Sequence, residues 1–546
     1  MTASGSAQGA YRSRTPYQGQ SAGQAANPTT DQLPVHAELP QASYPATLPQ
    51  PPVRPRRRGA ASLRSFAQPQ QALTVPIRGL ARVAQRQLAQ VALTRYQQRL
   101  RQKEETHEIL AFAVRLAETM FHYGADAADV DAAVVTVCAV YGIQDVEVDI
   151  THQSIMINYV SEFDEAAGRG QLPEAGGLGA EKLGLTLVRV VRSTSENYRA
   201  LHQLYRLVHD IAQGRVTRGR AERRLAQVNA QKKPYSPAVL LVWNLLMAGA
   251  FTLGVGGSWR AAVTSLVVFT VVNFVLVWAG RLNLPSYFMM AIGAATITVL
   301  ALLVSDSAGW FYTRGFYVSA PHIVAAGLMM LLPTFRLVSA VQDALHGFPL
   351  TAAGKFVITG ANFTGIIAGI AVALTVMNYF DATSLDVQGS VFSPPPLWVS
   401  IAGMAVGSAM SAAAWQGSAQ TICLTLLVSL LGQAAYYGVG AVMGEAGGRL
   451  QVLAGATLVG LSAALLGYLL HSPASIYYVP GMMFMLPGLT IFRSSYLVLG
   501  GEDVFAGVQG LTLAGVTVLL MATGIVCGTY VWDEITRRLR LRNSHQ

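Results

Sequence analysis

The sequence predicts a polytopic α-helical membrane protein, with about ten transmembrane helices in two inverted five-helix repeats. A small α+β cytoplasmic domain and a disordered N-terminal tail are expected to precede them. Three observations support this fold class: only 12% of residues are charged, against roughly 25% in globular domains; apolar residues form long blocks after Pro237; and one motif recurs within those blocks. The four parts are expected at residues 1–75, 76–235, 236–392 and 393–546.

The first part, residues 1–75, is rich in Gln, Pro, Ala, Ser and Gly. Too few apolar side chains are present to offset the entropy of ordering, so we predict a disordered tail. The formal net charge is +10, and basic residues cluster at 54–58, 218–233 and 537–542, outside the apolar blocks. Because no nucleic-acid-binding motif accompanies this charge, we expect the clusters to meet anionic membrane lipid, and we expect no nucleic acid as a partner.

The second part combines helical and strand patterns, which predicts a folded α+β domain. Apolar residues recur at helical spacing from Ile109 to Met120, and runs rich in β-branched residues predict strands. Further helices are expected near 128–140, 196–213 and 218–231, and strands at 146–150, 154–160 and 185–191.

Ten apolar segments follow, and most approach the ~20 residues that cross a ~30 Å hydrocarbon layer. The fourth and ninth are shorter and are broken by proline. The segments are approximately Ala238–Val255, Ala261–Ala279, Ser286–Val304, Tyr317–Leu332, Phe356–Tyr379, Leu397–Ala414, Ala419–Val439, Val452–Leu470, Ile476–Leu486 and Leu511–Trp532. A buried core of a soluble protein would explain any one of them, but not all ten.

The membrane region contains an internal repeat, because GLMMLLP at 327–333 reappears as GMMFMLP at 481–487. The segments therefore divide five and five. Since five is odd, the second half is expected to be inverted relative to the first, as in many secondary transporters, although channels can also be repeated. Ten spans put both termini on one side, and the basic clusters beside the first and last spans predict that this side is cytoplasmic.

The fourth and ninth segments both end in Leu-Pro, at Pro333 and Pro487. A proline withdraws a donor and frees a carbonyl one turn back, which protein or cavity water must satisfy within lipid. Mirrored interruptions of this kind indicate the binding site of a transporter. A simple proline kink is the alternative.

Charged residues follow the first of these prolines. Arg336 could bind a substrate carboxylate, and Asp343 an ammonium group or a coupling proton; with Lys355 they are costly in lipid unless paired or hydrated. The alternative is an interfacial loop with solvated charges. The second half keeps an arginine, Arg493, but has Leu497 opposite Asp343. Further polar candidates, whose ordinary role would be helix–helix hydrogen bonding, are Asn362 and Gln416.

A cluster in the second part contains His122, Asp126, Asp129 and Asp131. His122 and Asp126 could share a helix face and bind a metal. Gly124 marks a helix end, however, and Asp126 is well placed as the N-cap of the next helix. We therefore expect no metal and no cofactor. Because GxSxG, HExxH and Walker motifs are absent from the sequence, an enzyme is not expected.

Two runs carry a resemblance to a known family. LAETMFHYGADAADVDAAVVTVCAVYGI and RVVRSTSENYRALHQLYRLVHDIAQGRVTRGRAERRL resemble the cytoplasmic domain of the bacterial threonine/serine exporter (ThrE) family. The five-plus-five membrane region is similar to the same family, so the resemblance extends from about His107 to Trp532. The first Leu-Pro is usually followed by glycine in the family, where this chain has Thr334. Asp129-Val130-Asp131 replaces an Arg-Val-Glu-like triplet.

The resemblance implies a multi-pass protein of the bacterial inner membrane that exports threonine and serine, driven by the proton motive force. A small zwitterion needs a carboxylate site, an ammonium site and a hydroxyl partner. Arg336, Asp343, Asn362 and the backbone near Pro333 and Pro487 could supply them. The alternatives are a gated channel or membrane sensor with a ligand-binding cytoplasmic domain, and a membrane-tethered hydrolase. The sequence leaves the oligomeric state open, and we expect the cytoplasmic domain to cap the inner entrance.

Overall fold

The computed structural model describes residues 77–151, 153–161, 183–192, 194–305, 318–379, 395–500 and 503–544. The predicted disordered tail lies outside these residues. The chain divides into two units, Met1–Ala81 and Arg82–Gln546. All elements described below belong to the second unit, apart from the first residues of α1.

Within its described residues, the N-terminal domain has four helices and three strands. They are α1 (Ile77–His122), α2 (Ala127–Val140), β1 (Val146–Ile150), β2 (Ser154–Ser161), β3 (Leu183–Val190), α3 (Tyr198–Ala212) and α4 (Arg218–Ala230). The predicted helices and strands are thereby confirmed, and α1 begins earlier than the apolar spacing indicated. The strands form an antiparallel sheet in the order β1-β2-β3.

The core of this domain lies between α1 and one face of the sheet. Leu110, Phe112 and Leu116 of α1 are fully buried, as are Ile155 and Ile157 of β2. The alternation of buried and exposed residues along β2 is that of a half-buried strand. The turn between α1 and α2 passes through Gly124 at φ +92°, a conformation that favours glycine.

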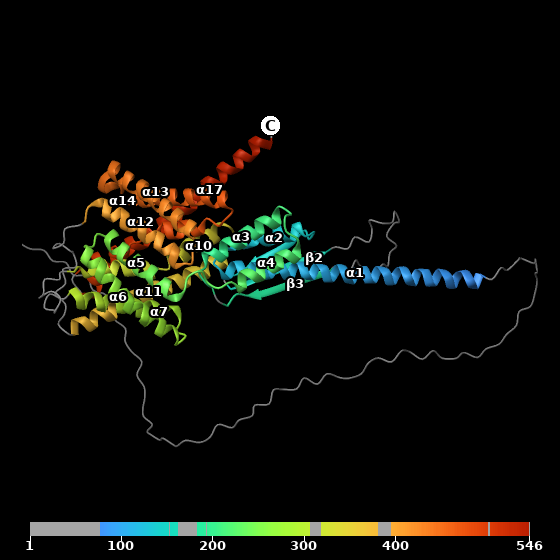
Figure 1. Cartoon of the computed structure of the whole chain (residues 1–546), viewed down its shortest axis with the longest axis horizontal. Coiled ribbons are helices and arrows are strands. Elements are labelled where there is room, and N and C mark those ends of the chain that lie inside the picture. Colours follow the sequence, from blue (N-terminus) through green and yellow to red (C-terminus); the bar gives the residue numbers. More distant parts are fainter. Residues whose placement is uncertain are drawn as a thin grey trace, which may run out of the picture. The chain divides into compact units, whose positions relative to one another are not determined.

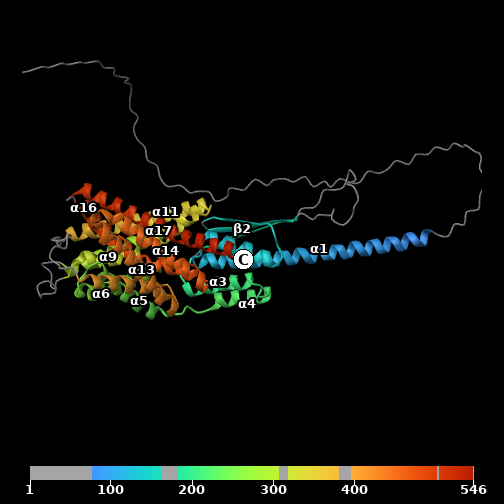
Figure 2. The same cartoon turned by 90° about the horizontal axis from the view of Figure 1, so that it is seen from above.

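A helical bundle follows, and in Figures 1 and 2 the helices α3 and α4 lie beyond its end. Its helices are α5 (Pro237–Gly254), α6 (Trp259–Gly280), α7 (Ser286–Ser305), α9 (Ala320–Leu331), α10 (Thr334–Leu345), α11 (Pro349–Tyr379), α12 (Leu397–Ala414), α13 (Ala419–Met443), α14 (Gly448–Leu470), α15 (Ser475–Gly481), α16 (Gly488–Gly500) and α17 (Val504–Ser544), with short 3-10 turns at Gly444–Gly447 and Met483–Met485. Among the described residues, eight helices are long and apolar enough to cross a membrane, or up to ten if each bent pair counts as one span. A polytopic membrane protein is therefore confirmed.

The two bent helix pairs lie at Pro333 and Pro487, where breaks were predicted. The first bends by 41° between α9 and α10, and the second by 48° before α16. Residues 334–345 form the helix α10, and α11 begins at Pro349 rather than at Phe356. The alternative of an interfacial loop after Pro333 is therefore wrong.

The two halves of the bundle use the same packing partners. α7 packs along α11 and α14 along α17, while α10 meets α11 as α16 meets α17. Glycines permit close approach at both long contacts: a Cβ built on Gly369 would lie 2.2 Å from the Ala291 carbonyl oxygen, and one on Gly528 would lie 2.2 Å from that of Thr457. This parallel supports the repeat, and its inverted arrangement across a membrane stays a prediction.

The broken spans of the two halves also contact each other, through α9 and α16. A Cβ built on Gly488 would lie 2.5 Å from the carbonyl oxygen of Ala325. The glycine after the second Leu-Pro therefore lets the two broken spans meet.

Candidate functional site

Asp343 of α10 is the most deeply buried charged residue predicted for the site, with 0% of its surface exposed. Its Oδ2 lies 2.6 Å from Nζ of Lys355 on α11, and its Oδ1 accepts the backbone N–H of Ala127 at 3.2 Å. A buried carboxylate is stable only when it is paired and hydrogen-bonded. The two predicted charges thus form an ion pair, which the first turn of α2 covers.

Ser339 of α10 extends this pair into the N-terminal domain. Its Oγ accepts a hydrogen bond from Lys355 Nζ at 2.6 Å and donates one to Oδ1 of Asp126. Asp126 occupies the predicted N-cap position of α2, but its side chain makes no capping hydrogen bond to that helix. The predicted position was right and the predicted side-chain role was wrong, because the carboxylate is bound to the bundle instead.

The second half of the bundle contributes Tyr478 of α15. Its hydroxyl donates to Oε1 of Gln342 at 2.8 Å and lies 3.5 Å from Oδ2 of Asp126. The cluster therefore joins the N-terminal domain to both halves of the bundle.

The carboxylates of the N-terminal domain are perturbed by this environment. Burial raises the pKa of Asp126 to about 6; nearby Lys355 opposes the shift, while Asp129 and Asp343 add to it. Burial also raises the pKa of Asp129, which accepts a hydrogen bond from the Tyr205 hydroxyl. With one lysine among three carboxyl groups, the cluster can bind and release a proton near neutral pH.

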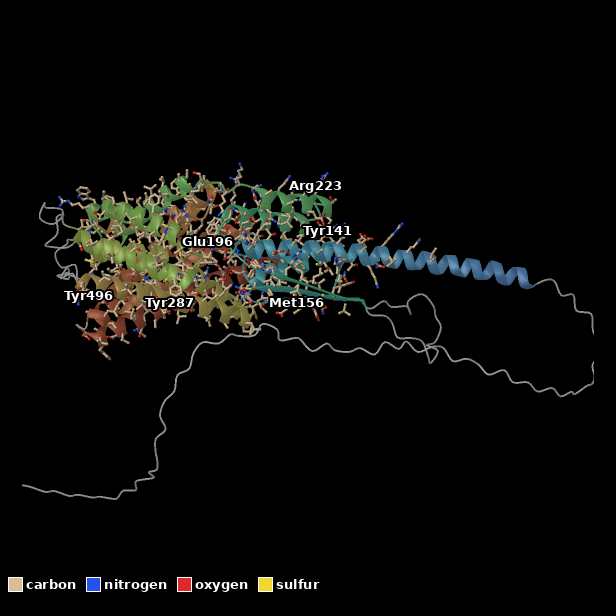
Figure 3. All side chains as sticks on the ribbon, turned by 90° about the horizontal axis from the view of Figure 1, so that it is seen from below. Tyr141, Met156, Glu196, Arg223, Tyr287 and Tyr496 are labelled. Carbon is tan, nitrogen blue, oxygen red and sulfur yellow. The ribbon has the colours of Figure 1, made fainter. Side chains whose placement is uncertain are left out.

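Pro333 and Arg336 lie at the break between α9 and α10. Pro333 is the N-cap residue of α10, and its carbonyl accepts the N–H of Arg336 at 3.1 Å. Burial raises the pKa of Glu196 in the N-terminal domain, and the charge of Arg336 opposes that shift. Figure 3 places Glu196 where this domain meets the bundle. Arg336 therefore lies near the same end of the bundle as Asp343.

Asn362 of α11 is 1% exposed, and its Oδ1 has no hydrogen-bond partner among the described residues. The hydroxyl of Thr359, one turn earlier on α11, is likewise buried and unpartnered within them. An unsatisfied buried polar group costs roughly 1–3 kcal/mol. Such groups call for an explanation, and a bound ligand or ordered water is one.

Two predicted residues of the second half lie elsewhere. Pro487 lines a pocket of about 570 Å³ with Phe484 and Thr490. Arg493 precedes by one turn Tyr496, which Figure 3 places at the end of the bundle away from the N-terminal domain. The structure thus separates Arg493 from the cluster around Asp343.

Gln416 also lies outside the spans, in the turn between α12 and α13. It adopts φ +63°, and its Oε1 accepts the N–H of Tyr235 at 2.9 Å. Gln416 therefore holds the segment that leads into α5. No three His, Cys, Asp or Glu side chains in the described part of the chain are arranged to hold a metal ion.

The sequence did not indicate that Asp126, Ser339 and Tyr478 act together. Asp126 and Ser339 are 213 positions apart, and Asp126 and Tyr478 are 352. The only local signal was the crowding of acidic residues after Gly124.

Residues 111–377 match the model of the family described as "Putative threonine/serine exporter". The chain is 28% identical over 440 residues to a "Probable threonine/serine exporter" of Mycobacterium tuberculosis, covering 78% of this chain and 77% of the relative. It is 26% identical over 435 residues to a "Threonine/serine exporter" of Corynebacterium glutamicum, covering 79% and 83%. No solved structure matches the chain significantly. The resemblance predicted from the sequence is confirmed.

Proposed function

We infer, from the likeness of residues 111–377 to the threonine/serine exporter family, that this chain is a membrane transporter that exports small amino acids such as threonine and serine. The observation that carries the proposal is the buried ion pair of Asp343 and Lys355, beside a broken span. Buried charges in membrane helices are costly and typically mark a substrate or ion pathway.

The substrate site is proposed at the first break, between Pro333 and Asn362. Arg336 is the group for the substrate carboxylate, because guanidinium binds carboxylate in bidentate geometry. Asn362 offers an unpartnered buried carbonyl oxygen for the ammonium or hydroxyl group. Asp343 is already paired with Lys355, so its proposed role is in coupling rather than in holding the amine.

We propose that export is coupled to protons entering through the cluster of Asp126, Ser339, Lys355 and Asp343. Three observations support this: the carboxyl groups outnumber the lysine, hydrogen bonds connect them, and the pKa of Asp126 is raised to about 6. The proposed orientation places both termini and the N-terminal domain in the bacterial cytoplasm, because the basic clusters adjoin the first and last spans. The surfaces of these clusters are proposed to meet anionic lipid.

The test is efflux of labelled threonine from proteoliposomes that contain the full chain, with and without a protonophore. Saturable efflux that the protonophore abolishes is expected. Arg336→Ala should raise the KM at least tenfold, while Arg281→Ala, which removes an exposed charge at the end of α6, should leave it unchanged. Efflux that rises linearly with substrate would favour the gated channel, and no efflux of any small amino acid would refute the exporter.

A further inference from the structure

The N-terminal domain closes one end of the bundle through contacts with both halves. In the first half, Thr351 donates to the carbonyl oxygen of Ile150 at 2.8 Å, beside the contacts of Asp126 and Ala127. In the second half, the N–H of Tyr198 donates to the carbonyl of Trp415 at 3.0 Å, and their rings lie 5.5 Å apart. The docked domain thus ties the two halves together at this end.

The contacts named above are hydrogen bonds, one ring contact and one charged cluster. Interfaces between domains of one chain usually resemble transient protein–protein interfaces, so relative motion of the domains is the default expectation. The carbonyl and N–H groups involved could be satisfied by water after separation. Docking of this kind is suited to repeated opening and closing.

We propose that the N-terminal domain is the movable inner gate of the transporter and that Asp126 is the residue whose protonation holds the gate shut. The proposal rests on the proposed function. It assigns a role in the transport cycle to a residue outside the membrane spans. Ser339, which accepts from Lys355 and donates to Asp126, connects this residue with the bundle.

The sign of the effect follows from the two environments of the carboxyl group. In the docked domain burial raises the pKa of Asp126 to about 6, whereas a hydrated aspartate has a pKa of about 3.9. Two pKa units correspond to roughly a hundredfold tighter proton binding in the docked state. By linkage, a proton favours docking, and undocking releases that proton to water on the inner side.

This direction suits an exporter driven by proton entry. Asp126 takes up a proton while the inner end is closed, then loses it to the cytoplasm as the domain swings away. The vacated end can then admit the next substrate. The charge of Asp129 acts on Asp126. Asp129 also lines a cleft of about 720 Å³ together with Tyr205 and His471. This cleft gives the proton a short route to water.

Other titratable groups act on Asp126 or on its neighbour Asp129 and must be separated from Asp126 in the test. They are Asp129 on α2, Tyr205 on α3, Asp343 and His346 at α10, Lys355 on α11, Tyr478 on α15 and Asp533 on α17. The rings of His209 and His471 also contact each other across the same joint, tilted by 43° with centroids 3.9 Å apart. Positive charge on both rings would repel the domain from the bundle, which is opposite in sign to the effect of Asp126.

The experiment measures the position of the domain rather than transport. Spin labels are attached at Arg223→Cys on the N-terminal domain and Leu282→Cys after α6, both exposed, in the full chain in nanodiscs. The native cysteines Cys138, Cys423 and Cys527 are first replaced. Distance distributions are recorded by pulsed electron resonance at about pH 5 and about pH 8, on either side of the pKa of Asp126.

We expect a single docked distance at the lower pH and a second, longer distance at the higher pH. Asp126→Asn, which mimics the protonated group, should give the docked distance at both values and reduce threonine efflux at least tenfold. Asp131→Asn is the same change on α2 at a residue outside the group formed by Asp126, Ser339, Lys355 and Asp343, and it should behave as the parent chain does. The same pH-dependent change in distance is expected in a chain that also carries His209→Gln, which removes the pair of imidazoles.

Two results would overturn the gate: identical distance distributions of the parent chain at the two pH values, or an unchanged pH response in Asp126→Asn. A second variant, Ser339→Ala, covers the case in which Asp126→Asn does not fold. It should weaken docking at both pH values, because Asp126 loses its hydrogen bond from Ser339. Failure of the exporter proposal would appear separately, as absent efflux from the parent chain with the distance change intact.

Discussion

The backbone N–H of Ala127 donates to Oδ1 of Asp343 across 216 positions of sequence. A carboxylate of a bundle helix thereby accepts a hydrogen bond from the first turn of α2. Asp126, which occupies the N-cap position of α2, binds Ser339 of the bundle instead. The positive end of the α2 dipole favours a negative charge at Asp343. The docked position of α2 and the burial of these charges therefore depend on each other.

The ion pair of Asp343 and Lys355 yields a first prediction, on stability. Lys355→Ala leaves an uncompensated buried carboxylate, so we expect a loss of roughly 3–5 kcal/mol. The double variant Asp343→Asn/Lys355→Met removes both charges and should recover much of that loss. Thermal unfolding in detergent measures both.

The matched control is Arg224→Ala, which breaks an exposed pair with Asp210 at 2.8 Å. Exposed pairs contribute about 0–1 kcal/mol, so little change is expected. Equal losses of stability from Lys355→Ala and Arg224→Ala would show that the buried ion pair contributes no more to stability than the exposed one.

The contact between the two broken spans yields a second prediction. Gly488→Ala places a methyl group 2.5 Å from the carbonyl oxygen of Ala325, which cannot yield without moving α9. Overpacking of this kind costs about 1–3 kcal/mol. We expect a lower unfolding temperature and slower efflux, because the added methyl group would push the two broken spans apart.

Gly515→Ala on α17 serves as the control, because a Cβ there meets no atom within 4 Å. It should be neutral or slightly stabilising, since alanine favours helix. Normal stability and transport in Gly488→Ala would mean that the close approach of α9 and α16 is unimportant.

Local patterns account for what the sequence predicted correctly. β-branched runs identified β1, β2 and β3 to within two residues, because strand periodicity and its turn residues are local signals. The Leu-Pro pairs located both breaks for the same reason. The helix α10 was missed, although its buried Val338, Ser339 and Gln342 repeat at helical spacing. Its charged residues and the preceding proline favoured a loop.

The site was predictable only in part. Asp343 and Lys355 stand out individually as charges among apolar residues, so composition could identify them. Their connection to Asp126 depends on docking of two domains, for which one sequence carries no local signal. The crowding of acidic residues after Gly124 was visible, but capping explains such a pattern equally well. Arg493 was grouped with the site through the repeat alone, and the structure separates it from the cluster around Asp343.

Asn362 yields a third prediction, which separates binding from structure. Asn362→Leu removes a buried carbonyl oxygen that has no partner among the described residues, so stability should be unchanged or higher. If that oxygen binds substrate, the KM for threonine efflux should rise roughly tenfold, the loss of about one hydrogen bond. Asn273→Leu on α6 is the matched control, expected to leave the KM unchanged. Reduced stability with an unchanged KM would assign Asn362 a structural role.

The raised pKa of Asp126 yields the fourth prediction, on the pH dependence of unfolding. Because the folded protein binds this proton more tightly than the unfolded chain, the resulting stabilisation is complete below the unfolded pKa of about 3.9. It is lost as the pH rises through about 6, the folded value. The unfolding temperature of the parent chain, relative to that of Asp126→Asn, should therefore fall between about pH 4 and about pH 6.5 and then level off.

Burial of Asp129 acts in the same direction, so the raw curve of the parent chain contains both groups. The difference between parent and Asp126→Asn isolates the first. Burial also raises the pKa of Asp131, so Asp131→Asn, measured in parallel, should change the parent curve in the same direction but less than Asp126→Asn does. A difference curve that is flat across this range would mean that Asp126 is ionised in the docked domain. A carboxylate that stays ionised there could not exchange the proton that the gate requires, because its charge would be the same docked and undocked.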